Sequence, residues 1–146
     1  MQRVARLSDL VPGEPVQRAI TGSRRDAWTL YPQETIGRVW LVRRGDEDTP
    51  PGDSKVDAYT TVCPHLGCSI SRDTSRDQFI CPCHKASFDF NGQAVSPREK
   101  GRKNPSPRDM DSLSCRIVED EKTGQWWVEV KYEKFRYGSI RKISRG

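Results

Sequence analysis

The stretch TTVCPHLGCSISRDTSRDQFICPCHKASFDF, residues 60–90, decides the interpretation of this sequence. It holds four of the five cysteines and both histidines of the 146-residue chain, in CPHLGC at 63–68 and CPCH at 81–84. Fifteen residues separate His65 from Cys81. Because cysteine and histidine are scarce elsewhere, these two clusters predict one metal centre held between two loops.

The order of the ligand types narrows the choice of metal. Each cluster offers a cysteine before a histidine, as Cys-x-His and then Cys-x-x-His. Zinc fingers usually place two cysteines before two histidines, so this order is unusual for zinc. It suits a two-iron cluster that has two cysteines on one iron and two histidines on the other. A zinc site stays the alternative.

The two boxes resemble those of Rieske 2Fe–2S iron–sulfur proteins. In particular, the sequence resembles the soluble domain of the Rieske subunit of cytochrome bc-type complexes, which are quinol:cytochrome c oxidoreductases. The resemblance implies a Rieske-type 2Fe–2S cluster with Cys63 and Cys81 on one iron and His65 and His84 on the other.

The leftover cysteines, one in each box, carry a second implication. Rieske subunits of bc-type complexes join this pair as a disulfide, whereas Rieske oxygenases and their ferredoxins usually lack it. The resemblance therefore implies a Cys68–Cys83 disulfide and a location on the exocytoplasmic, periplasmic face of a bacterial inner membrane. The odd cysteine, Cys115, is expected as a buried free thiol in a strand.

The rest of the chain reads as short strands. Segments rich in β-branched and aromatic residues predict strands at 4–7, 16–21, 27–31, 38–43, 58–62, 78–81, 86–90, 113–119 and 125–131. The polar segment 44–55 is expected as a loop, and no long amphipathic helix is found. The fold class is all-β, and the resemblance implies a Rieske-like antiparallel β-sandwich base with an inserted cluster-binding subdomain.

The domain organisation is expected to be a single Rieske domain over 1–146. The base would comprise about 1–59 and 109–131, the cluster-binding subdomain about 60–108, and a basic C-terminal tail 132–146. No run of about 18 to 20 apolar residues occurs, so we expect no membrane span in this stretch. The resemblance implies membrane association through an N-terminal anchor that these residues do not include.

The net charge of +5 lies in the tail, because residues 131–146 hold six basic residues and one acidic residue. The remaining charges are balanced and interspersed, which does not favour nucleic-acid binding. A basic tail can contact phosphate, anionic lipid or an acidic partner, and a solvated terminus is the alternative.

The residues after the second box bear on the reduction potential. Many high-potential Rieske proteins carry Ser two residues and Tyr four residues after the last ligand, where this chain has Ala86 and Phe88. Ser87 should face the opposite side of an extended segment. Losing two hydrogen bonds to sulfur predicts a potential in the lower or middle part of about −150 to +300 mV, and hence a menaquinol-type donor.

The resemblance also implies a docking surface and a mechanism. NPSPR at 104–108 is similar to the proline loop of the family, so Leu66, Pro105 and Pro107 are expected to form an apolar cap that docks on a cytochrome b-type subunit. His84 is expected to face quinol, with His65 also exposed. The electron would pass to a c-type cytochrome, which makes the chain a redox subunit rather than a stand-alone enzyme. Alternatives are the Rieske subunit of an arsenite oxidase-like enzyme and a Rieske ferredoxin or oxygenase component.

Overall fold

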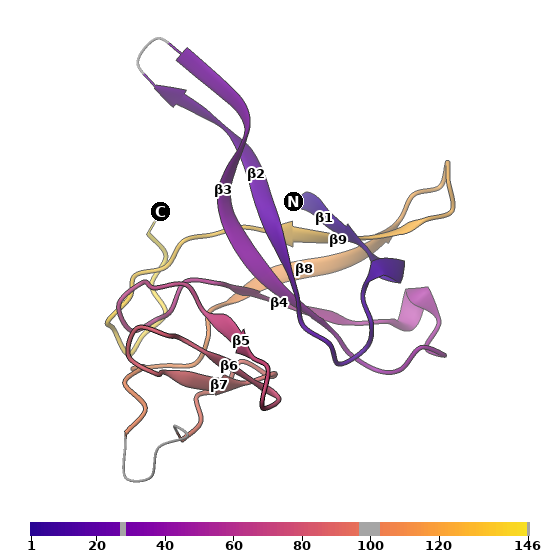
Figure 1. The fold of residues 1–146 in the computed structure, drawn as a ribbon. Helices are drawn as coiled ribbons and strands as arrows, with labels where there is room; N and C mark the ends of the chain where they lie inside the picture. The colour runs from indigo at the N-terminus through magenta and orange to yellow at the C-terminus, as the bar shows by residue number, and fades with distance from the viewer. Residues whose placement is uncertain (27–28, 97–102, 146) are drawn as a thin grey trace.

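The computed structural model describes residues 1–26, 29–96 and 103–145, and it is all-β (Figure 1). Within these ranges the only helices are two short 3₁₀ turns, Leu7–Asp9 and Pro51–Asp53. No helix in the described residues is long and apolar enough to cross a membrane. The strands are β1 (Gln2–Arg6), β2 (Val16–Asp26), β3 (Thr29–Arg43), β4 (Val56–Thr60), β5 (Ser71–Asp73), β6 (Gln78–Ile80), β7 (Ser87–Asp89), β8 (Ser112–Glu119) and β9 (Trp126–Lys131).

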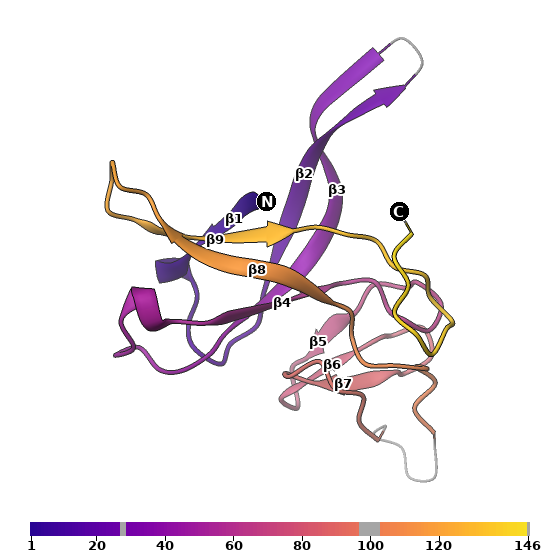
Figure 2. The ribbon, with the colours of Figure 1, turned by 180° about the vertical axis from the view of Figure 1, so that it is seen from behind.

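Six strands form the base, in the antiparallel order β1-β9-β8-β4-β3-β2. Strands β1, β9 and β8 form one half of the base, and β4, β3 and β2 form the other. Only two residue pairs, between β4 and β8, join the two halves. Apolar side chains from both halves share one core, which buries Ala5, Leu7, Leu10, Ile20, Val39, Leu41, Val56, Ala58, Leu113, Val128 and Val130. This confirms the antiparallel sandwich expected for the base, and Figure 2 shows its two halves from behind.

A second, three-stranded antiparallel sheet, β5-β6-β7, lies between β4 and β8 in the chain (Figure 1). Its core includes Phe79 and Phe88, both fully buried, and these pack with Trp40 and Tyr59 from the base strands. The indole N–H of Trp40 also donates to the carbonyl of Ile70 at 3.0 Å. Aromatic side chains of the base therefore seat the small sheet and the loops it carries.

Arg44, in the segment expected only as a polar loop, reinforces this seat. Its guanidinium donates to the Asp57 carboxylate at 2.7 Å, to the Tyr59 hydroxyl at 3.2 Å and to the backbone carbonyl of Phe90 at 2.7 Å. The first two groups belong to β4 and the third follows β7. A single side chain thus joins the two sheets.

The strand boundaries differ from the predicted ones mainly in the β2–β3 hairpin. The paired region extends beyond 16–21 and 38–43 toward the turn, with bulges after Ile20 and Gly22. Residues 27 and 28 of the predicted strand 27–31 lie outside the described residues. Strand β5 was not predicted, because its sequence Ser-Arg-Asp carries no apolar alternation.

Candidate metal centre

The two boxes form loops with the same backbone closure. In the first loop, Cys63 N–H donates to the carbonyl of Cys68 at 2.7 Å, and Gly67 N–H donates back to the carbonyl of Cys63 at 3.0 Å. In the second loop, Cys81 N–H donates to the carbonyl of Ala86 at 2.8 Å, and Lys85 N–H donates to the carbonyl of Cys81 at 2.9 Å. The two loops therefore present the side chains at their tips in related ways.

Both loops need a left-handed residue at their fifth position. Gly67 supplies it in the first loop with φ of 83°. Lys85 supplies it in the second with φ of 63°, and it is the only described residue other than glycine with a positive φ. Left-handed backbone is unfavourable for a residue with a Cβ, so the second loop stores some backbone strain.

The free thiols of Cys63 and Cys81 lie inside the protein. They are 0% and 2% exposed, and each begins one of the two loops. The pKa of the Cys63 thiol is raised to about 12, mainly by burial and also by the neighbouring Cys81, while backbone N–H groups of His65 and Leu66 partly offset the rise. Two adjacent buried thiols flanked by backbone donors suit thiolate ligands of a cationic metal centre.

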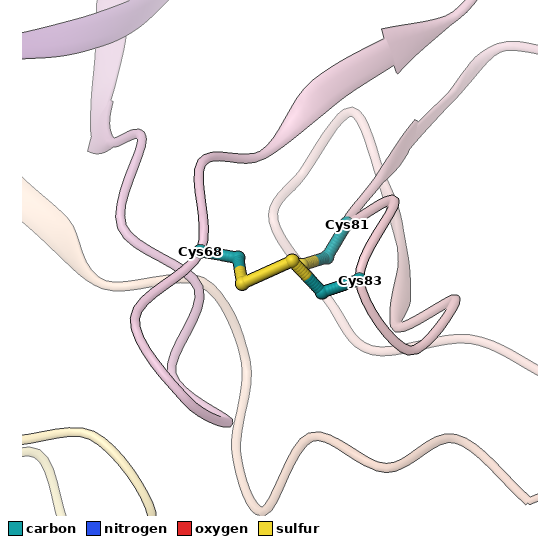
Figure 3. Close-up of side chains that lie close together, drawn as sticks. All are labelled: Cys68, Cys81 and Cys83. Carbon is teal, nitrogen blue, oxygen red and sulfur yellow. A yellow bond between two sulfur atoms is a disulfide. The ribbon is translucent and has the colours of Figure 1, made fainter.

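A disulfide joins the two loops between Cys68 and Cys83, as the resemblance implied (Figure 3). The sulfur of Cys81 lies next to this bond, within 4.8 Å of both disulfide sulfurs. Because Cys68 and Cys83 are oxidised, they offer no thiolate to a metal. Of these three neighbouring sulfurs, only that of Cys81 is a candidate metal ligand. The other two form the disulfide that links the loops.

The two imidazoles lie together near the surface. The ring centroids of His65 and His84 are 5.0 Å apart, with the planes close to perpendicular. His84 is exposed. His65 was expected to be exposed as well, but it is half-buried. The arrangement separates a buried pair of sulfur donors from an outer pair of nitrogen donors.

The residues that follow the second box lie as their sequence positions suggested. Ala86 and Phe88 are fully buried and bring no side-chain donor to the centre. The Ser87 hydroxyl donates to the carbonyl of Lys85 at 3.2 Å and is used within its own loop. No described side-chain hydroxyl at these three positions is hydrogen-bonded to a cysteine sulfur.

The segment 104–108 is tied to the start of β7, directly after the second loop, by a residue whose role was not foreseen. The Asn104 amide donates to the carbonyls of Ser87 and Val95, each at 2.7 Å. Pro105 and Pro107 are half-buried, whereas Leu66 on the first loop is 52% exposed. Asparagine before proline is a common turn signal, but nothing in the sequence indicates which carbonyls it reaches.

The odd thiol, Cys115, lies on β8 and is half-buried rather than buried. Its pKa is raised to about 11, mainly by burial and also by the nearby Asp57 carboxylate. It belongs to the base sheet, and the described structure gives it no contact with the boxes.

The donor set fits a two-iron cluster. Each loop contributes one thiol and one imidazole. The two thiols lie inside the protein and the two imidazoles lie nearer the surface. A single tetrahedral zinc would use the same donors without needing them sorted in this way, whereas a cluster with two distinct irons requires it.

Comparison with known proteins identifies the family. A family model for the Rieske [2Fe-2S] domain matches residues 1–112, which is more than half of the chain. Sequence relatives include the cytochrome b6-f complex iron-sulfur subunit of Synechococcus elongatus, 32% identical over 72 residues, and that of Cyanothece sp., 30% identical over 86 residues. These matches cover 49% and 59% of this chain and 36% and 42% of the relatives, so the chain spans less than half the length of the relatives it matches.

Solved structures agree on the fold. The cyanobacterial plasma membrane Rieske protein PetC3 from Synechocystis PCC 6803 has a TM-score of 0.51 and 19% identity, over 88% of this chain and 99% of that one. Naphthalene 1,2-dioxygenase has a TM-score of 0.52 and 16% identity, over 86% of this chain and 25% of that one. The chain therefore belongs to the Rieske [2Fe-2S] domain family, and its cofactor is a Rieske-type 2Fe–2S cluster.

Proposed function

Starting from a Rieske iron–sulfur domain, we propose that this protein takes an electron and a proton from quinol and passes the electron to a c-type cytochrome, within a cytochrome bc-type complex. The relatives named as cytochrome b6-f complex iron-sulfur subunits support this role. The observation that carries it is the outward pair of imidazoles over an inward pair of thiols, tied by a disulfide.

The ligands we propose are Cys63 and Cys81 for one iron and His65 and His84 for the other. When bound, the cluster supplies one-electron oxidation and reduction at a potential set by its surroundings. The buried thiols keep water from the sulfur end. Each imidazole would bind through one ring nitrogen, which would leave the other free to hold or release a proton.

His84 is the residue we propose to contact quinol, because its side chain is exposed. Its outer nitrogen would accept a hydrogen bond from the quinol hydroxyl and then take that proton. His65, half-buried beside it, would have the supporting role. Leu66 is exposed next to His65 and, with Pro105 and Pro107, would provide the apolar rim that docks on a cytochrome b-type subunit.

We propose a menaquinol-type donor, because residues 86–88 offer no free side-chain hydroxyl to the cluster. Ala86 and Phe88 have no hydroxyl, and the Ser87 hydroxyl is used by the Lys85 carbonyl. Hydrogen bonds to the sulfurs stabilise the more negative reduced state, so their loss lowers the potential. The expected midpoint lies in the lower or middle part of about −150 to +300 mV.

The domain division and location belong to the same proposal. We propose that the base, about 1–59 and 109–131, presents the cluster-binding unit, about 60–108, and that the whole faces the periplasm of a bacterial inner membrane. The disulfide between Cys68 and Cys83 supports an oxidising compartment. Membrane association would come from an N-terminal anchor outside these residues.

The test is a potentiometric titration followed by electron transfer with purified partners. We expect a midpoint in the lower or middle part of the Rieske range, reduction of the cluster by a menaquinol analogue, and reoxidation by a soluble c-type cytochrome. Arsenite serves as the competing donor. A midpoint near the top of the Rieske range contradicts the menaquinol assignment, and reduction by arsenite but not by any quinol contradicts the proposed role.

A further inference from the structure

The C-terminal residues after β9 form a small hairpin of their own. Arg136 N–H donates to the carbonyl of Ile143 at 2.7 Å, and Arg145 N–H donates to the carbonyl of Lys134 at 2.8 Å. We call residues 134–145 the tail hairpin. In both ribbon views this end of the chain lies beside the loop between β4 and β5, which carries the first box (Figures 1 and 2).

The tip of the tail hairpin contacts the first box directly. Gly138 N–H donates to the carbonyl of Pro64 at 2.6 Å. The ring of Tyr137 packs on Gly67, where an added Cβ would lie 3.1 Å from a ring carbon. These contacts fall on the residues immediately before and two after His65. The tail hairpin therefore touches the loop on both sides of that imidazole.

Arg108 also holds the tail hairpin in place, through hydrogen bonds to its backbone carbonyls. Its guanidinium is 8% exposed and makes two hydrogen bonds of 2.8 Å with the Asp111 carboxylate, which is 4% exposed. The same group donates to the carbonyl of Ser139 at 2.8 Å and to the carbonyl of Arg136. Because a guanidinium has five donors in a fixed plane, it can hold a carboxylate and two carbonyls at once.

Asp111 links this fastening to the base. Its backbone carbonyl accepts from Thr60 N–H at 3.0 Å, at the end of β4 where the chain enters the first box. The segment 104–108, the end of β4 that leads into the first box, and the tail hairpin therefore share one hydrogen-bonded junction. Nearly complete burial of both charged groups makes their pairing obligatory for the folded chain.

We infer that the tail hairpin forms one wall of the cluster site. Tyr137 within it and Arg108 beside it are positioning residues that hold the first box and set how open it is to water. The inference rests on the proposed ligand role of Cys63 and His65. The disulfide restrains the first box at Cys68, and the tail hairpin restrains it at Pro64 and Gly67. His65 lies between Pro64 and Gly67, two residues that the tail hairpin contacts.

The consequence for electron transfer is that the tail hairpin restrains the backbone on both sides of His65 and keeps the carbonyl of Pro64 from water. Without the tail hairpin, the carbonyl of Pro64 would turn to water and the loop would move about the disulfide. Greater access of water favours the more negative reduced state, which raises the midpoint potential.

The test uses Tyr137→Ala in the full chain with its cluster. Tyr137→Phe keeps the aromatic ring and should retain the native behaviour, and Ile140→Ala is the matched control. Ile140 is in the same hairpin tip and is 82% exposed, whereas Tyr137 packs on Gly67. We expect hydrogen-exchange protection of the Cys63 and Gly67 amides, which close the first loop, to fall about tenfold in Tyr137→Ala and to be retained in the other two. The midpoint potential should rise only in Tyr137→Ala.

A second pair tests the anchor. Arg108→Gln should lose exchange protection at the Gly138 amide, whereas Arg141→Gln removes the same charge from an exposed residue and should keep it. If the point variants fold poorly, a chain ending at Phe135 should reproduce the loss of protection in the first box; its midpoint is not compared, because it also lacks four basic residues. Unchanged protection in Tyr137→Ala and in the shortened chain would overturn the inference, as would lost protection with an unchanged potential in Tyr137→Ala. Since neither readout uses quinol or a cytochrome, failure of the proposed function would be seen separately.

Discussion

Gly92→Ala probes the contact that seats the small sheet on the base. Gly92 has φ of 77°, and an added Cβ would lie 2.6 Å from a ring carbon of Tyr59. Tyr59 is 5% exposed and packs with Phe79, so its ring has little room to move. The Gly92 carbonyl also accepts from Met110 N–H at 2.8 Å, which fixes the turn in place.

Gly124→Ala is the matched control, since Gly124 has φ of 72° with no atom within 4 Å of an added Cβ. A left-handed backbone conformation costs alanine about 1 to 2 kcal/mol at either position. Overpacking against a fixed ring adds about 1 to 3 kcal/mol at Gly92 alone. We therefore expect losses of about 2 to 5 kcal/mol for Gly92→Ala and about 1 to 2 kcal/mol for Gly124→Ala.

The assay is thermal unfolding of the cluster-loaded protein, followed by circular dichroism and by cluster absorbance. For a chain of this length about 1 kcal/mol corresponds to about 3 °C in Tm, so the Tm of Gly92→Ala should lie at least about 3 °C below that of Gly124→Ala. Equal Tm values for the two variants would refute the packing of Gly92 on Tyr59.

Three further predictions concern the loops and the odd thiol. Replacing Cys68 and Cys83 together by serine removes a link of sequence separation 15 and should cost about 3 kcal/mol on the chain-entropy model, measured by urea unfolding; equal midpoints with and without the bond would contradict it. Lys85→Gly should gain about 0.5 to 1 kcal/mol in the same assay, because glycine accepts the left-handed backbone at this position, and a loss would argue against that strain. Cys115, with a pKa of about 11 instead of 9.0, should react with iodoacetamide at pH 8 about a hundredfold more slowly than in the unfolded chain, as peptide mass spectrometry can measure. Since folding raises this pKa, the stability contributed by the neutral thiol should be full below about pH 9 and be lost as the pH rises through about 11; reaction at the unfolded rate would exclude the burial.

The parts of the fold that sequence analysis predicted are those with a local signal. Strands β8 and β9 carry β-branched and aromatic residues on either side of a Gly-containing turn, and both were predicted close to their observed bounds. The two Cys/His boxes predicted a metal centre because their residues are scarce and their spacing is regular. Their pairing across the disulfide followed from family resemblance, because spacing alone does not specify which cysteines meet.

The parts that escaped prediction depend on contacts between distant segments. Arg44 and Arg108 lie in polar stretches without periodicity, yet each binds groups from several elements. The tail contacts the first box through a backbone N–H of Gly138, a donor that every residue other than proline carries. Charge composition marked the tail as basic but did not indicate that its backbone and Tyr137 are what the site uses.

The most direct test of the account is pulsed EPR on the reduced protein after labelling with ¹⁵N-histidine. The chain contains two histidines, so every labelled nitrogen belongs to His65 or His84. We predict hyperfine coupling to two histidine nitrogens in a two-iron, two-sulfide centre. An absence of coupling to labelled nitrogen, or a protein that holds zinc in place of the iron–sulfur cluster, would contradict the proposed ligands.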